Sequence, residues 1–63
     1  MDPLDLLPVV EKFLSDTGMT PTVFGRLAMR DPVFVRDLRA GRELRRKSRD
    51  RVLHFIAQYR KAA

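Results

Sequence analysis

The chain contains no cysteine, which excludes disulfide bridges, thiolate zinc sites and thiol nucleophiles. A single histidine, His54, cannot by itself form a metal site or a Ser-His-Asp constellation. The 63 residues can form only one small hydrophobic core, with little room for a substrate cavity. We therefore expect a single domain over residues 1–63 that is not an enzyme and has no metal, cofactor or small-molecule ligand.

Long apolar runs and strand patterns are missing as well. No stretch approaches the roughly 20 apolar residues of a membrane span, and the first ten residues carry acids where a secretory signal would carry bases. Apolar and polar residues never alternate for more than a few positions, and there is no hairpin dipeptide. These absences predict a cytoplasmic protein of the all-α class without a membrane partner.

Positive charge, by contrast, is abundant and unevenly distributed. The chain has 13 Lys and Arg residues against 8 Asp and Glu, a net charge of +5, and most of the cations are arginine. Residues 1–25 hold one cation and four acids, whereas residues 26–63 hold twelve cations and four acids. Such asymmetry is typical of proteins that bind nucleic acids or anionic membranes. Arginine suits phosphate and guanine in particular, because its guanidinium bonds bidentately.

Start and stop signals divide the chain into four helices. Two capping residues are each followed by proline, whose missing N–H would have no partner in a first turn. Glycine, which often follows a last turn, marks two ends, at positions 18 and 41. The signals predict a compact bundle of about four helices, over roughly residues 4–16, from Thr20-Pro21 to about Met29-Arg30, over residues 32–40, and from Ser48 to about Lys61.

Apolar residues at helical spacing give the expected core. They are Val9, Val10, Phe13 and Leu14 in the first helix, Val23, Phe24, Leu27 and Ala28 in the second, Phe34, Val35 and Leu38 in the third, and Val52, Leu53, Phe55, Ile56 and Tyr59 in the fourth.

The second and third helices have the spacing of a helix-turn-helix, with about two residues between the end of one and the start of the next. Gly25 lies inside the second helix, where glycine costs about 1 kcal/mol relative to alanine. We expect the third helix to cross there and to leave no room for a side chain. Opposite its apolar face, the third helix presents a face that consists of Val33, Arg36, Asp37 and Ala40.

The residues from Phe24 to Gly41, FGRLAMRDPVFVRDLRAG, resemble the helix-turn-helix of lambda-repressor-like (Cro or XRE type) DNA-binding domains. The features that carry the resemblance are the pair Phe24-Gly25, the opening Asp31-Pro32, the aliphatics Val35 and Leu38, and Gly41. One departure lies in the turn, where the family usually has glycine followed by valine or isoleucine, and this chain has Met29 and Arg30.

The resemblance implies sequence-specific binding to double-stranded DNA, with helix 32–40 in the major groove, by a repressor-like transcriptional regulator associated with the nucleoid when bound. The exposed face predicts base contacts, with Arg36 on guanine, Asp37 on cytosine and Val33 on a thymine methyl, while Ala40 lets the helix lie deep. The phosphate contacts that we expect are Thr20, Thr22, Arg26, Arg39, Arg42, Arg45, Arg46, Lys47 and Arg49.

One such helix reads only a few base pairs, so adequate specificity asks for two copies about one helical turn apart. We therefore expect a homodimer, or paired binding on a pseudo-palindrome. The last helix has more apolar area than one side can bury. Its expected dimer interface consists of Leu53, Phe55, Ile56 and Tyr59.

Two other classes of function remain open from the sequence. A small helical protein-interaction module, such as an adaptor or an antitoxin-like partner, would also fit the surplus apolar area of the last helix. A basic amphipathic helix over residues 45–61 would bind an anionic membrane or an acidic partner. The absence of tryptophan, and the clustering of charge at the start of that segment, argue against a membrane.

Overall fold

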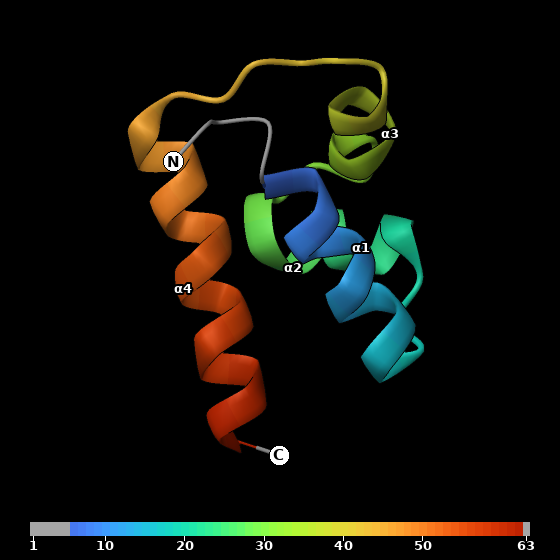
Figure 1. Cartoon of the computed structure of the whole chain (residues 1–63), viewed down its shortest axis with the longest axis vertical. Coiled ribbons are helices and arrows are strands. Elements are labelled where there is room, and N and C mark those ends of the chain that lie inside the picture. Colours follow the sequence, from blue (N-terminus) through green and yellow to red (C-terminus); the bar gives the residue numbers. More distant parts are fainter. Residues whose placement is uncertain (1–5, 63) are drawn as a thin grey trace.

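The computed structural model describes residues 6–62, which form four α-helices and no strand. The helices are α1 (Leu6–Thr17), α2 (Pro21–Met29), α3 (Phe34–Arg39) and α4 (Arg46–Ala62). In Figure 1, α4 runs along one side of the molecule and the other three helices form the opposite side. The all-α class is thereby confirmed. The expected start of the first helix at residues 4 and 5 lies outside the described residues.

The connection between α1 and α2 forms as its sequence signals predict. The Thr17 hydroxyl donates to the Phe13 carbonyl at 2.8 Å and accepts from the Met19 N–H at 3.2 Å, and Gly18 between them has a φ of 73°. The Thr20 hydroxyl then accepts from the N–H of Val23 at 3.3 Å, which makes Thr20 the N-cap of α2. Pro21 occupies the first turn, where no partner for its nitrogen is needed.

The turn after α2 contains a left-handed residue. Met29, which the resemblance aligned with a glycine, is still helical, and the left-handed conformation falls on Arg30, with a φ of 53°. The Arg30 N–H donates to the Arg26 carbonyl at 3.0 Å. A left-handed conformation costs a residue other than glycine about 1–2 kcal/mol. It is held here by the next bond, from the Asp31 N–H to the Gly25 carbonyl at 3.0 Å.

The third helix is shorter than the predicted span of residues 32–40. The Asp31 side chain accepts from the Val33 N–H at 3.1 Å and its carbonyl accepts from the Phe34 N–H at 3.1 Å, so the Asp-Pro start forms a turn and α3 begins at Phe34. Gly41, with a φ of 99°, ends the helix as predicted. Its N–H donates to the Leu38 carbonyl at 3.1 Å and the next N–H donates to the Asp37 carbonyl at 3.0 Å, which is a Schellman motif.

The fourth helix starts before its predicted cap. Helix α4 begins at Arg46, and the Arg49 N–H donates to the Arg45 carbonyl at 3.0 Å. Ser48 therefore lies inside the first turn and is not the N-cap. The run of good helix formers before it, including two arginines, favours this extension.

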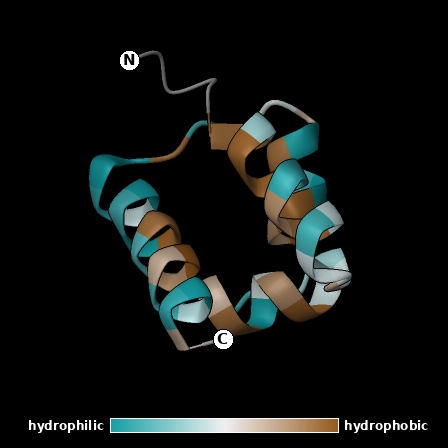
Figure 2. Cartoon of the chain, turned by 60° about the horizontal axis from the view of Figure 1, so that its bottom comes forward, coloured by the Kyte–Doolittle hydropathy of each residue, from teal (hydrophilic) through white to brown (hydrophobic). Residues whose placement is uncertain are grey.

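Aromatic rings form the centre of the core. Phe13, Phe24 and Phe34 are fully buried, and the ring centroid of Phe24 lies 5.5 Å from that of Phe13 and 6.4 Å from that of Phe34. Helix α2 packs against both α3 and α4. Figure 2 shows the hydrophobic faces of the helices turned inward, while the first turn of α4 is hydrophilic.

The buried stripes are narrower than the sequence pattern suggests. Five residues that were expected in the core are exposed, namely Val9, Val23, Leu27, Leu53 and Tyr59. Each lies at the edge of its helix's apolar stripe, and in so small a protein a helix has neighbours on one side only.

Candidate nucleic-acid interface

Gly25 lies at the closest contact in the helix-turn-helix. A Cβ atom at this position would collide with the carbonyl oxygen of Asp31 and would come within 3.3 Å of the Phe34 Cβ. The glycine is therefore required because the turn and the start of α3 lie directly on α2. The expected close approach is present, although the turn backbone, more than α3 itself, is what a side chain would meet.

Helix α3 buries one face and exposes the other. Phe34, Val35 and Leu38 are buried. On the opposite side, Arg36 and Ala40 are exposed, Asp37 is half-buried, and Val33, which precedes the helix, retains 36% of its accessible area. Among residues 6–62, Arg36 has no acid partner within ion-pair distance. The four expected base-contacting residues therefore lie on or beside one accessible surface.

Arg39 of α3 forms an ion pair with a residue of α1. Its guanidinium donates from Nε at 2.8 Å and from Nη2 at 2.7 Å to the two carboxylate oxygens of Glu11 on α1. This hydrogen bonding lowers the pKa of Glu11 and raises that of Arg39. Arg39 was expected to contact phosphate, and in the chain without DNA its charge is matched by Glu11.

Arg42 is also paired within the chain. Its Nη1 atom lies 3.3 Å from a carboxylate oxygen of Asp31 and 3.5 Å from one of Asp37. Its Cζ atom lies 6.0 Å from the centroid of the Phe34 ring. The sequence marked Arg42 only as one of a run of cations, because residue spacing does not show which of them turns back toward α3.

The connection between α3 and α4 carries the remaining cations to one side of the molecule. In Figure 1 it crosses the top, from the end of α3 to the first turn of α4. Arg45 and Lys47 are exposed without an acid partner among the described residues, Arg49 is half-buried, and Arg46 lies 4.0 Å from Asp50. The expected phosphate contacts of this segment, apart from Arg42, thus remain available.

Helix α2 contributes two threonines and an arginine at its outer side. Thr20 and Thr22 lie at its exposed N-terminal end, and Arg26 is exposed one turn later. Sequence reasoning missed Arg30 and Arg51, which are also exposed and have no acid partner within residues 6–62. The position of Arg30 depends on its left-handed backbone conformation, which no sequence signal predicted.

The expected dimer interface on α4 does not form a single outward face. Ile56 is buried in the core, and the half-buried Phe55 has its ring centroid 5.5 Å from that of Phe24. The Tyr59 ring centroid lies 5.3 Å from that of Phe13. Phe55 and Ile56 therefore belong to the core of the single chain, and only Leu53 and part of Tyr59 stay exposed.

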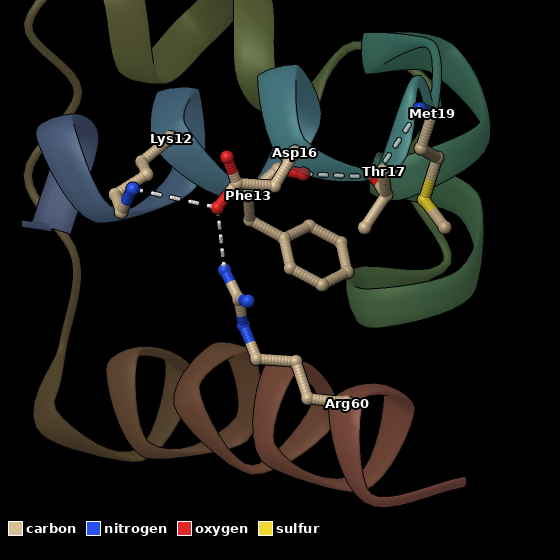
Figure 3. A network of polar contacts seen from close by, with 6 residues as sticks. All are labelled: Lys12, Phe13, Asp16, Thr17, Met19 and Arg60. Atoms are coloured by element: carbon tan, nitrogen blue, oxygen red, sulfur yellow. Dashed lines mark hydrogen bonds and ion pairs between the residues drawn. The ribbon is translucent and has the colours of Figure 1, made fainter. Parts of the chain in front are cut away.

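An ion pair between Asp16 and Arg60 joins α1 to α4, and Lys12 of α1 lies beside it. Asp16 accepts from Arg60 at 3.2 Å and pairs with Lys12 at 3.5 Å, and Figure 3 shows its carboxylate between the two cations. The hydrogen bond from Arg60 is the main cause of a lowered pKa at Asp16. Arg60 also lies over the Phe13 ring, with its Cζ atom 5.5 Å from the ring centroid. The charges of Lys12 and Arg60 are therefore matched within the protein.

The described part of the chain contains no cluster of three His, Cys, Asp or Glu side chains placed to hold a metal ion. No helix within it is long and apolar enough to cross a membrane. A scan against protein-family models found no match, and searches of curated proteins and of solved structures found none either.

Proposed function

We propose that this protein binds double-stranded DNA sequence-specifically and regulates transcription, with α3 and the turn before it reading the major groove. The observation that carries the proposal is the exposed Arg36, which has no acid partner among residues 6–62, on a helix whose other face packs on α2 beside Gly25. A helix that enters a groove must be rigidly supported from behind and must present donors or acceptors in front.

The distribution of unpaired charge supports the same proposal. The cations paired within residues 6–62 are Lys12, Arg39, Arg42, Arg46 and Arg60. Those without such a partner include Arg36 on α3, and Arg45 and Lys47 at the start of α4. Such cations would neutralise phosphates, and Arg36 on the exposed side of α3 would reach guanine.

We further propose that two copies bind neighbouring half-sites, because one short helix reads too few base pairs to select a site. With Ile56 buried and Phe55 half-buried, the exposed apolar area on α4 is small. This favours pairing that depends on DNA over a dimer that is stable in solution. Sedimentation with and without duplex DNA distinguishes the two arrangements.

The deciding experiment for function is selection of bound duplexes from a random pool, followed by affinity measurements on the selected and a scrambled sequence. We expect an enriched motif with two related halves, and an affinity gap that Arg36→Ala narrows. If no sequence is enriched and no duplex is bound at low salt, the proposal is wrong.

A second candidate function, binding to another protein, is favoured by one observation on α2. Val23 and Leu27 lie one turn apart and are 42% and 57% exposed. Their neighbours on the same side are Arg26 and Arg30. An acidic partner helix with apolar residues would match this strip. Binding to such a partner that withstands high salt and is lost in Val23→Ser with Leu27→Ser, without any binding to DNA, would favour this function.

The membrane alternative finds less support in the structure. The apolar side of residues 46–61, with Val52 and Ile56 in its centre, is buried against the rest of the chain. Membrane binding by this segment would require α4 to leave the core. Co-sedimentation with anionic vesicles tests it directly.

A further inference from the structure

Arg42 lies close to the turn before α3 and to two residues of α3, one of them buried. Its guanidinium Nη1 atom lies 3.3 Å from Asp31 Oδ2, in the turn, and 3.5 Å from Asp37 Oδ2, on the helix. Its Cζ atom lies 6.0 Å from the ring centroid of the buried Phe34. Its backbone N–H donates to the Asp37 carbonyl at 3.0 Å and so closes the last turn of α3.

This arrangement is unlike that of Arg45, only three positions further along. Arg45 is exposed and has no acid within ion-pair distance among residues 6–62. A phosphate contact needs donors that point outward and a charge that no neighbour has already matched. Arg45 meets the condition of an unmatched charge, and Arg42, whose Nη1 atom faces two carboxylates, does not.

We propose that Arg42 is a positioning residue of α3 and not a phosphate contact. It holds the turn at Asp31 against the helix at Asp37, and it offsets the negative charge of both carboxylates on the side of the protein that approaches DNA. The second part of this inference rests on the proposed function, whereas the first part concerns the protein alone.

The electrostatic reason is direct. Asp31 lies in the turn before α3 and Asp37 on its accessible side, and their side chains are 32% and 38% exposed. Two carboxylates facing a polyanion repel it, and a cation in contact with both reduces that repulsion. Without Arg42, the Asp37 carboxylate has no other cation within ion-pair distance among the described residues.

A double-mutant cycle on a random-sequence duplex tests this role, because affinity for random DNA does not depend on base reading. Arg42→Ala should weaken binding about tenfold, through exposed like charge. Asp37→Asn should then improve binding by about threefold more in the Arg42→Ala background than in the wild type. Arg42→Lys keeps the charge and should stay close to the wild-type affinity.

Arg45→Ala is the matched control. It should make the slope of log affinity against log salt shallower by about 0.9, as loss of one phosphate contact does. Its effect should be the same with and without Asp37→Asn. Arg42→Ala should also make the slope shallower, because salt screens the repulsion from the exposed carboxylates, so the coupling to Asp37→Asn separates the two roles. Equal gains from Asp37→Asn in both backgrounds would show a phosphate contact and overturn the proposal.

Amide hydrogen exchange without DNA tests the positioning itself. Arg42→Ala should speed exchange of the backbone amides in residues 37–42 about tenfold and leave those of α4 unchanged, while Arg45→Ala should change neither. Unchanged exchange in residues 37–42 would overturn the positioning role. If the wild type binds no duplex, the proposed function fails, and the exchange result alone decides whether Arg42 positions α3.

Discussion

The guanidinium of Arg39 and the carboxylate of Glu11 form a forked pair, with N···O distances of 2.8 and 2.7 Å, that joins α3 to the middle of α1. The two residues are far apart in the sequence and come from its basic and acidic parts. The pair fixes the flank of α3 next to Arg36. At least one acid in the first part of the chain thus has a structural role, because Glu11 pairs with a cation of the candidate reading helix.

We predict that Arg39→Ala leaves the salt dependence of DNA binding unchanged, because the Arg39 charge is already matched by Glu11. Half of each side chain is in solvent, so the melting temperature should fall by about a few degrees at most. Glu11→Gln should lower the melting temperature similarly. A shallower salt slope for Arg39→Ala would return this residue to the phosphate contacts.

Acid should weaken the fold through Glu11 and Asp16. Hydrogen bonds from Arg39 and Arg60 lower the folded-state pKa of these carboxyls below the ordinary values of 4.5 and 3.8. Their contribution to stability is therefore complete above about pH 4.5 and is lost as the pH falls through the lowered pKa values. Thermal unfolding from pH 7 to pH 2 should show a steeper decline in the wild type than in Glu11→Gln with Asp16→Asn. Parallel profiles would contradict this assignment.

The sequence predicts most helix ends because their signals are local. Thr20-Pro21, Gly18 and Gly41 each act through backbone conformation or a bond within a few residues. The start of α4 was predicted wrongly because serine is a good capping residue, and the helix begins two residues before Ser48 without using it as a cap. No sequence signal marked the left-handed conformation of Arg30, which is followed by the hydrogen bond from the Asp31 N–H to the Gly25 carbonyl.

The sequence predicts which residues form the exposed side of α3, but not which acids pair with the arginines beside it. Helical periodicity places Arg36 opposite Val35 and Leu38, and the structure has the same arrangement. The partners of Arg39 and Arg42 depend on how the helices cross, which composition and spacing do not specify. The same holds for the last helix. Its excess of apolar residues suggested an interface, but the rings of Phe55 and Tyr59 pack against that of Phe13.

Replacing Gly25 with alanine should destabilise the fold, although the same change in an open helix would stabilise it by about 1 kcal/mol. The added methyl group would meet the Asp31 carbonyl, which cannot move without opening the turn. We expect a loss of about 1–3 kcal/mol, measured by urea unfolding. Gly18→Ala is the control, because nothing lies within 4 Å of a Cβ there and only its φ of 73° opposes the change. Stabilisation by Gly25→Ala would show that α2 and the turn do not touch.

Arg36→Ala should reduce affinity for the selected sequence by about 1–3 kcal/mol and relax the preference at one base pair. Binding to scrambled duplexes should change far less, since direct base readout is absent there. The fold should be unaffected because the side chain is exposed. Competition assays with every base pair at each position of the site give the measurement. Equal losses on selected and scrambled DNA would identify Arg36 as a phosphate contact.

Arg45 and Lys47 should account for part of the salt dependence of binding. Both are exposed and have no acid partner among residues 6–62, and they lie at the start of α4, at the far end of the connection from α3. Each phosphate that a cation neutralises contributes about 0.9 to the slope of log affinity against log salt. Replacing both with alanine should therefore make the slope shallower by about 1–2 per protomer, with similar losses on selected and scrambled duplexes.

Lys61→Ala provides the matched control for this pair. Lys61 is an exposed lysine of the same helix as Lys47, but it belongs to the last turn of α4. At about 1.5 Å per residue, the two positions are about 20 Å apart, well beyond the screening length of about 10 Å at 0.1 M salt. The Lys61→Ala slope should match the wild type. If it instead falls as far as the slope of the double variant, DNA binding depends on net charge alone, and the segment after α3 has no particular part in it.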